Sequence, residues 1–344
     1  MSIRVAVLMG GRSSEHEVSL ASAAAVIAAL DPARFEVVPV VISTEGVWSV
    51  EGEPVAIVPG PEGAAQLVSL TGGAPPRALD MAFPVLHGPH GEDGTVQGAL
   101  ETAGVPYVGA GVAASAVAMD KALFKVFLRE AGIPTPEHVV VTRGAWEADP
   151  DAARARVAEV VGYPAFCKPA RLGSSVGISP VPDAGALDAA LELAFRHDPK
   201  ALIERAIDGR EVEVGVLEGP EPLASPVGEI TYDGDWYDYD TKYRPGLSQV
   251  HVPADLPPEV AERARVLALR AFAAVDCAGL ARIDFFVTPD GDVLLSELNT
   301  MPGFTPTSVY ARLMEAAGIP YPELVGRLID LGIARAAEAR RYRC

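Results

Sequence analysis

Two apolar runs separated by a turn signal make up the segment ARIDFFVTPDGDVLLSELN, which ends at Asn299. Asp290 and Gly291 favour a tight turn, and the flanking runs are rich in β-branched and aromatic residues, so the segment predicts an antiparallel hairpin. A two-residue loop at Asp290 and Gly291 makes the numbers of paired residues add up to a constant. That register places Asp284 opposite Glu297, whereas a three-residue loop would shift the pairing.

One face of this hairpin collects polar side chains, because successive residues of a strand point to opposite faces. The polar face carries two opposed pairs: Asp284 with Glu297, and Arg282 with Asn299. The other face is apolar and is expected to enter a core: Ile283, Phe285, Val287 and Leu298. Two carboxylates and an amide oxygen are hard ligands that suit magnesium carrying a nucleotide's phosphates. The alternative is a solvated hairpin with an Arg–Asp pair, which the apolar second face disfavours.

In the rest of the chain, the pattern of apolar residues changes along the sequence. With 344 residues, it exceeds the size of one hydrophobic core, so two or three domains are expected. The N-terminal third predicts βαβ units and a parallel sheet, with strands near 3–9, 35–43 and 82–86 and a helix near 19–30. A helix is expected after Asp120, and short strands of α+β character from Ala165 onward. Residues 232–253 lack an apolar period and are expected to form a lid.

The net charge and the apolar runs exclude several classes of partner. A formal net charge of -18 disfavours nucleic acid and anionic membrane surfaces, and no stretch approaches the roughly 20 apolar residues that a membrane-spanning helix needs. The three cysteines lack the paired spacing of a zinc or redox motif. A cytoplasmic protein without membrane insertion is therefore expected.

A small-residue loop follows a lysine in the segment KPARLGSSVGIS. Backbone N–H groups of such a loop approach phosphate closely, so the segment could cradle a triphosphate. It is not a Walker A loop, because Lys168 precedes the glycines, and an ordinary flexible loop is the alternative on spacing alone.

The order of these features, from lysine through glycine-rich flap and acidic strand to carboxylate-x-asparagine, resembles the ATP-grasp superfamily. Within it, GGRSSEHEVSL, HGPHGEDGTVQG, MDK, KPARLGSSVG, EVEVGVL, YDYDTKY, RIDFF and ELNTMPGFTPTS resemble the signatures of D-alanine–D-alanine ligases. The resemblance implies a mixed α/β and α+β chain of three-domain ATP-grasp architecture, with an N-terminal parallel-sheet (pre-ATP-grasp) domain. The expected boundaries are 1–120, 121–208 and 209–344, with the lysines and flap in the second range and the lid and magnesium site in the third.

The resemblance also assigns nucleotide-binding residues. The lysines expected to hold ATP phosphates are Lys121, Lys168 and, from the lid, Lys242. The flap is expected at Ser174, Ser175 and Val176, the adenine-contacting hinge at Glu204, Ala206 and Ile207, and the ribose contact at Glu211. Asp284, Glu297 and Asn299 match the magnesium ligands, in agreement with the hairpin argument; two ions are expected, with manganese as a substitute.

Further residues match the positions that handle the amino acids. Glu15 matches the carboxylate that receives the first D-alanine's ammonium, with His87 nearby and with Ser174 and Tyr243 as hydrogen-bonding partners around it. The groups expected to stabilise the oxyanion of the tetrahedral intermediate are Arg282 and the backbone of Gly303. The second D-alanine's carboxylate is expected at Ser308 and Val309.

The resemblance implies ATP-dependent ligation of two D-alanine molecules through an acylphosphate, for peptidoglycan precursor synthesis, by a homodimer. A relative that makes D-alanyl-D-lactate or D-alanyl-D-serine is an alternative, although Tyr243 favours D-alanine. A second alternative is a non-catalytic nucleotide-binding regulator on the same fold, whose signature would be a lost metal ligand or flap lysine. No such loss is present in the sequence.

Overall fold

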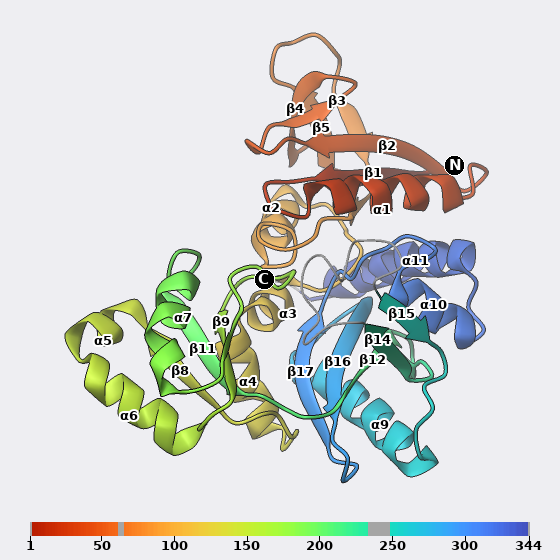
Figure 1. Cartoon of the computed structure of the whole chain (residues 1–344). Coiled ribbons are helices and arrows are strands. Elements are labelled where there is room, and N and C mark those ends of the chain that lie inside the picture. The colour runs from red at the N-terminus through yellow and green to blue at the C-terminus, as the bar shows by residue number, and fades with distance from the viewer. Residues whose placement is uncertain (1, 61–64, 233–247, 343–344) are drawn as a thin grey trace.

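The computed structural model describes residues 2–60, 65–232 and 248–342, and these form three sheets that follow one another along the chain (Figure 1). Each sheet falls inside one of the three predicted domain ranges, and the boundaries themselves stay a prediction. The expected lid residues Lys242 and Tyr243 lie outside the described residues, as does most of the segment 232–253.

The first sheet has the strand order β6-β5-β4-β3-β2-β1-β7. Its β1, β2 and β7 are parallel, as the βαβ pattern predicts. Strands β3 to β6 extend it antiparallel, because turns of a few residues join them and parallel pairing needs a longer crossover. The strands are β1 (Ile3–Gly10), β2 (Phe35–Ile42), β3 (Trp48–Val50), β4 (Glu53–Pro59), β5 (Ala65–Ser69), β6 (Arg77–Leu79) and β7 (Met81–Pro84). The helices of this part of the chain are α1 (His16–Ala29), α2 (Thr95–Ala103) and α3 (Val112–Met119), and α3 contacts β17 of the third sheet.

The second sheet is antiparallel, in the order β10-β9-β11-β8. Its strands are β8 (His138–Thr142), β9 (Ala165–Pro169), β10 (Ser179–Val181) and β11 (Lys200–Arg205). Its helices are α5 (Arg143–Ala148), α6 (Pro150–Val160) and α7 (Leu187–Ala194), with a 3-10 turn η2 (Ala184–Ala186). Side chains of these helices form one core with Cys167 and Ile203 of the strands. The opposite face of β9, which carries Phe166 and Lys168, is therefore left to line a cavity.

Helix α4 (Lys121–Glu130) joins the first sheet to the second and begins where the sequence predicts. The carboxylate of Asp120 caps it, accepting hydrogen bonds from the backbone N–H groups of Ala122 and Leu123 at 3.1 Å each. Its apolar side chains Phe124 and Leu128 are buried in the core of the third sheet. The cap and this packing fix where the first lysine of the helix points.

The third sheet runs β15-β14-β12-β16-β17, with β13 paired to β12. Its strands are β12 (Arg210–Leu217), β13 (Leu223–Ala224), β14 (Gly228–Tyr232), β15 (Ser248–His251), β16 (Leu280–Val287) and β17 (Val293–Asn299). Helix α9 (Pro258–Ala274) lies between β15 and β16, and α10 (Val309–Ala316) and α11 (Tyr321–Ala339) follow β17. Helix α9 covers one face of this sheet (Figure 1). Helix α10 packs against β12 of this sheet, and α11 packs against α1 and β7 of the first sheet. Tyr310 and Leu328 of these helices share a core with Val7 and Phe83.

The hairpin of β16 and β17 has the predicted pairs at its functional end. Arg282 is opposite Asn299 and Asp284 is opposite Glu297. The turn is one residue longer than predicted, because Val287 pairs with Val293 and the Thr288 N–H donates to the Asp292 carbonyl. A β-bulge between these two regions shifts the register back by one residue, so the longer turn does not move the polar pairs.

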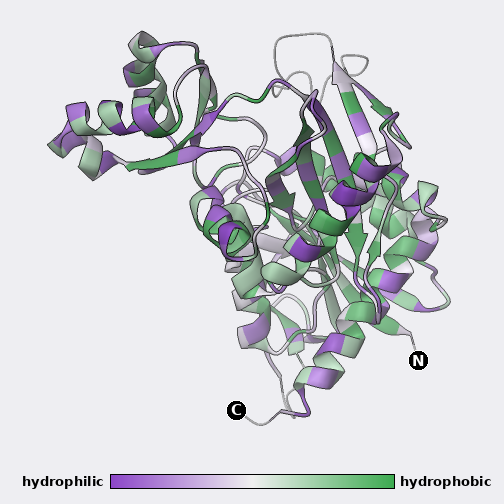
Figure 2. Cartoon of the chain, turned by 90° about the horizontal axis from the view of Figure 1, so that it is seen from below, coloured by the Kyte–Doolittle hydropathy of each residue, from purple (hydrophilic) through white to green (hydrophobic). Residues whose placement is uncertain are grey.

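The hydropathy pattern agrees with this layering (Figure 2). Strands of the sheets carry long hydrophobic stretches, and many helices show hydrophobic and hydrophilic residues on the same ribbon, as expected for helices with one covered side. Among the described residues, no helix combines the length and the apolar character needed to cross a membrane.

The back of the hairpin should determine the stability of the third sheet. Phe285 is 1% exposed in the core under α9. Phe285→Ala is expected to lower the free energy of unfolding by about 3–5 kcal/mol through lost contacts and a cavity. Leu70→Ala, at a side chain that is 64% exposed, should change it by less than about 0.5 kcal/mol. Urea unfolding checks both variants, and equal midpoints would contradict this account of the core.

Candidate active site

A cavity of about 320 Å³ lies between the second and third sheets. The second sheet lines it with Phe166, Lys168 and Glu204, and the third lines it with residues of β12, β16 and β17, including Glu211 and Asp284. Lys168 on one wall thus faces several carboxylates on the other, a distribution suited to a bound anion and its counter-cation.

Three carboxylates form a row across β12, β16 and β17, with Glu213 beside Asp284 and Asp284 beside Glu297. Arg282 compensates this charge: its Nε lies 2.8 Å from Asp284 Oδ1 and 3.0 Å from Glu213 Oε2, and its Nη2 lies 2.7 Å from Asp284 Oδ2. Burial opposes the guanidinium charge, but Asp284 and Glu213 outweigh it and raise the pKa of Arg282 well above its ordinary value. Asn299 donates from Nδ2 to Asp284 Oδ2 at 3.1 Å.

The donor set on this face fits magnesium. Asp284, Glu297 and Asn299 offer two carboxylates and an amide oxygen, which are hard ligands. Within residues 2–60, 65–232 and 248–342, no cluster of three or more His, Cys, Asp or Glu side chains is arranged to hold an ion. An ion at this face therefore needs further oxygens from a bound phosphate or from water, as magnesium in nucleotide sites does.

Two lysines face this acidic wall. Lys121 Nζ donates to the carbonyl of Leu172 at 2.8 Å and lies 3.6 Å from Glu297 Oε2. Lys168 Nζ donates to Glu204 Oε2 at 2.6 Å. Burial lowers the pKa of Lys168, but the Glu204 carboxylate more than offsets this and the net shift is upward. Lys168 is therefore cationic at neutral pH.

The predicted flap lies between the lysines. Ser174 and Ser175 have φ values of 52° and 57°, in the left-handed region that non-glycine residues seldom adopt. Such strained backbone is typical of ligand-clamping loops, where successive N–H groups point into one concavity. Both serines line the cavity between the sheets, whereas Val176 is not part of its lining.

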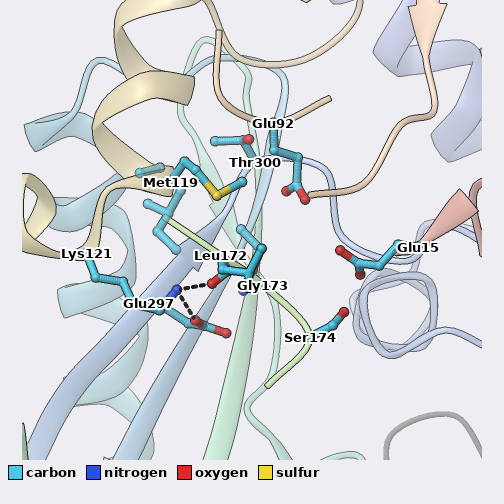
Figure 3. Close-up of a pocket in the computed structure, with 12 residues that line it drawn as sticks. Glu15, Glu92, Met119, Lys121, Leu172, Gly173, Ser174, Glu297 and Thr300 are labelled. Atoms are coloured by element: carbon cyan, nitrogen blue, oxygen red, sulfur yellow. Dashed lines mark hydrogen bonds and ion pairs between the residues drawn. The ribbon is translucent and has the colours of Figure 1, made fainter. Parts of the chain in front are cut away.

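A second cavity of about 50 Å³ adjoins the first and shares part of its wall. The residues common to both linings are Lys121, Leu172, Gly173, Ser174 and Glu297. Figure 3 shows Glu15, at the start of α1, with its carboxylate directed toward Ser174 of the flap, and Glu92 directed into the same space from another loop. Asn299 also lines this smaller cavity.

Side chains of the first domain hold the loop after β17 in place. The N–H of Met301 donates to Glu92 Oε1 at 2.9 Å, and the Met301 carbonyl lies 2.9 Å from His87 Nδ1. The other ring nitrogen of His87 lies 3.2 Å from Ser22 Oγ, which also accepts the N–H of Phe304 at 3.1 Å. His87 is 3% exposed, and this burial lowers its pKa, so the ring is neutral. Its contacts are those of a residue that positions this loop, and its predicted catalytic role stays a prediction.

Of the other predicted residues that the structure describes, some line the cavities and some do not. Ile207 and Glu211 line the large cavity, and Glu211 Oε1 accepts from the Tyr232 hydroxyl at 2.6 Å. Ala206 is absent from the lining, and its N–H donates to the Pro164 carbonyl. Gly303 and Ser308 are neighbours, since a Cβ at Gly303 would lie 3.3 Å from Ser308 Oγ.

Ser308 precedes α10, and its hydroxyl accepts the N–H of Thr305 at 3.0 Å. Val309 is the first residue of α10. The pair thus lies at a helix N-terminus, where a carboxylate is favoured by the helix dipole. Neither residue lines the two cavities, so their assignment stays a prediction.

The residues that sequence reasoning missed are Glu92 and Glu213. Strand alternation in EVEVGVL could have found Glu213, because it shares a face with Glu211. Glu92 lies in the motif HGPHGEDG. One of its partners, Gly88, is in the same motif, but the other, Met301, is 209 residues away in the sequence. No local pattern shows the second contact.

A cavity between two antiparallel sheets, with lysines and a flap on one side and a carboxylate–amide face on the other, defines an enzyme of the ATP-grasp class. Family models support this. The model described as "D-ala D-ala ligase N-terminus" matches residues 4–110, and the one described as "D-ala D-ala ligase C-terminus" matches residues 127–330. The chain belongs to the D-alanine–D-alanine ligase family.

Relatives and solved structures agree with this. The chain is 52% identical over 337 residues to the D-alanine–D-alanine ligase of Deinococcus radiodurans, covering 97% of this chain and 99% of that protein. The D-alanine–D-alanine ligase structure from Coxiella burnetii has 34% identity and a TM-score of 0.87, covering 99% of this chain and 96% of that one. The VanG D-Ala:D-Ser ligase from Enterococcus faecalis has 35% identity and a TM-score of 0.86, covering 96% and 100%.

The Glu92 carboxyl group should make stability depend on pH. Desolvation and the neighbouring Glu15 raise its pKa from 4.5 to about 8. Between pH 4.5 and about pH 8, Glu92 is deprotonated in the unfolded chain and protonated in the folded chain. Its contribution to the free energy of unfolding therefore falls as the pH rises. Glu92→Gln does not titrate there, so its stability relative to the wild type should increase from pH 5 to pH 8.5. Urea midpoints at the two pH values check this, and a difference independent of pH would contradict it.

Proposed function

We propose that this chain joins two molecules of D-alanine into D-alanyl-D-alanine at the expense of ATP, in the synthesis of peptidoglycan precursors. The observation that carries the proposal is the wall shared by the two cavities. A nucleotide in the larger cavity and an amino acid in the smaller one meet at Lys121, Ser174 and Glu297. A phosphoryl group can cross at that place, and the D-alanine–D-alanine ligases among the relatives support the substrates.

ATP occupies the cavity between the second and third sheets. Lys121 and Lys168 contact its phosphates under the flap, while Ile207 and Glu211 lie on the side of the base and ribose. Asp284, Glu297 and Asn299 would hold two magnesium ions, or manganese in their place. Bound there, the metal spreads the negative charge of the triphosphate.

The first half of the reaction makes an acylphosphate. Glu15 receives the ammonium of the first D-alanine, so that the substrate carboxylate points at the shared wall. A carboxylate oxygen attacks the γ-phosphorus, the bond to the β-phosphate oxygen breaks and ADP leaves. Positioning and charge stabilisation by the lysines supply most of the rate, and the flap over Ser174 keeps out water that would hydrolyse the product.

The second half forms the peptide bond. The amine of the second D-alanine attacks the acyl carbon, and phosphate leaves as the tetrahedral intermediate collapses. Arg282 and the Gly303 N–H stabilise the developing oxyanion, which is the purpose that preorganised donors serve in acyl transfer. Glu92, His87 and Ser22 contribute indirectly, because their hydrogen bonds fix the backbone on either side of Gly303. The carboxylate of the second substrate binds at Ser308 and Val309.

We further infer a cytoplasmic homodimer. ATP and nucleotide-linked precursors are cytoplasmic, and three widely spaced cysteines suit a reducing compartment. Sedimentation of the purified chain tests the oligomeric state, and a monomeric mass at micromolar concentration would rule out the dimer.

Phosphate release across a panel of substrates tests the activity itself. With ATP and magnesium, D-alanine alone should support turnover, while L-alanine should be at least ~10²-fold poorer because its methyl group points the wrong way in the small cavity. D-lactate or D-serine offered with D-alanine should leave the dipeptide as the main product. A dominant depsipeptide or D-alanyl-D-serine product would favour the related ligases, and no phosphate release with any substrate would favour a nucleotide-binding regulator.

Gly88 gives a test of the first amino-acid site. Its φ is +69°, and a Cβ there would lie 2.7 Å from Glu15 Oε2. Gly88→Ala should displace this carboxylate and lower kcat/KM for D-alanine by about 10²-fold, the cost of misplacing a substrate-orienting group. Gly52→Ala is the matched control, because Gly52 has φ +83° and nothing within 4 Å of a Cβ. Equal activities of the two variants would show that Glu15 does not orient the substrate.

A further inference from the structure

Lys125 is a buried lysine that has no role in the mechanism proposed above. It lies one helical turn after Lys121 on α4, and its side chain is 1% exposed. Its Nζ forms an ion pair with Glu204 Oε1 and donates to the hydroxyl of Thr135 at 2.5 Å. Lys125 does not line the nucleotide cavity. Burying a lysine is costly, so a buried charge at this place calls for a reason.

Glu204 connects this lysine to the cavity. While Oε1 pairs with Lys125, Oε2 pairs with Lys168 at 2.6 Å. One carboxylate is thus shared between two lysines, and only Lys168 and Glu204 reach the cavity wall. Burial opposes ionisation of Glu204, but the two lysines lower its pKa to about 2. The carboxylate is therefore anionic. Burial lowers the pKa of Lys125, the Glu204 carboxylate opposes that shift, and the ion pair between them forms with Lys125 in its charged state. The three groups together are then a cation–anion–cation group.

The charge count of this group differs from that of a simple ion pair. Lys168 and Glu204 alone would form a neutral pair, in which the carboxylate cancels the charge of the lysine. With Lys125 on the other oxygen, the three groups carry a net charge of +1, and the exposed end of that charge is Lys168. In a partly desolvated site, one unit of charge near a triphosphate is a large electrostatic effect.

We propose that Lys125 is a positioning residue for the nucleotide, which neutralises Glu204 from behind so that Lys168 presents a full positive charge to the phosphates. The proposal rests on the nucleotide site proposed above. Glu204 then holds Lys168 in place through their ion pair, while Lys125 keeps Glu204 from cancelling the charge of Lys168.

Binding of ATP and of adenosine, measured by calorimetry, tests the proposal. Lys125→Met keeps the length of the side chain and removes the charge. It should weaken ATP binding at least tenfold and leave adenosine binding within about threefold, because adenosine has no phosphate to sense the charge. Lys200→Met is the matched control: Lys200 is a partly buried lysine paired with Asp120, away from the cavity lining. It should bind both ligands as the wild type does.

The double variant Lys125→Met/Glu204→Gln gives the sharper result. Removing both charges returns the net charge to +1 on Lys168. Glu204 is also an expected adenine contact, so the readout is the ratio of ATP affinity to adenosine affinity, and most of the loss in that ratio should be reversed. If Lys125 served packing alone, the second substitution would deepen the loss or leave it unchanged, and that outcome would overturn the proposal. Should the single variant not fold, the double variant still decides, because loss of a whole buried pair is tolerated better than loss of one partner. A ratio of ATP affinity to adenosine affinity tenfold below that of the wild type would then refute the proposal.

The two proposals fail in different ways. If the wild type binds no ATP, the proposed function is wrong. If the wild type binds ATP and Lys125→Met binds it equally well, the proposed function stands and the role of Lys125 is refuted.

Discussion

The pairing of β16 with β17 places the carboxylates of Asp284 and Glu297 opposite each other, and the rest of the site is arranged around that charge. Like charges on adjacent strands destabilise a sheet unless cations lie nearby. Arg282 supplies one from within the sheet and Lys121 supplies another from α4. Glu213 extends the acidic row on β12, and Arg282 pairs with it as well. A metal ion bound at this face with a nucleotide would add further positive charge beside these carboxylates.

The small cavity depends on contacts between segments far apart in the chain. Helices α10 and α11 follow the third sheet but share a core with the first, which brings the loop after β17 against the loop around His87. Hydrogen bonds from Glu92, His87 and Ser22 then fix that loop on both sides of Gly303. The N-terminal part of the chain thereby contributes Glu15, which is proposed to bind one substrate, and also holds the backbone expected to act on the intermediate.

The hairpin shows both the reach and the limit of sequence reasoning. Strand alternation and the turn signal gave the correct opposition of Asp284 and Glu297, although the turn is a residue longer than predicted and a bulge compensates for it. Neither deviation has a local signature. The roles of Glu92 and Lys125 were not predicted for a different reason. Their partners, Met301 and Glu204, belong to distant segments, so these contacts form only when the chain is folded. The antiparallel part of the first sheet was missed because its short strands carry no distinctive period.

The proposed magnesium site implies that the acidic face of the third sheet binds ATP only through a divalent cation. Calorimetric titration of ATP with and without magnesium, in the wild type and in Asp284→Asn, tests it most directly. The wild type should bind ATP much more tightly with magnesium than without. Asp284→Asn should lose most of that enhancement and bind metal-free ATP at least as well as the wild type, because one repelling charge is gone. An equal magnesium enhancement in both proteins would contradict the claim.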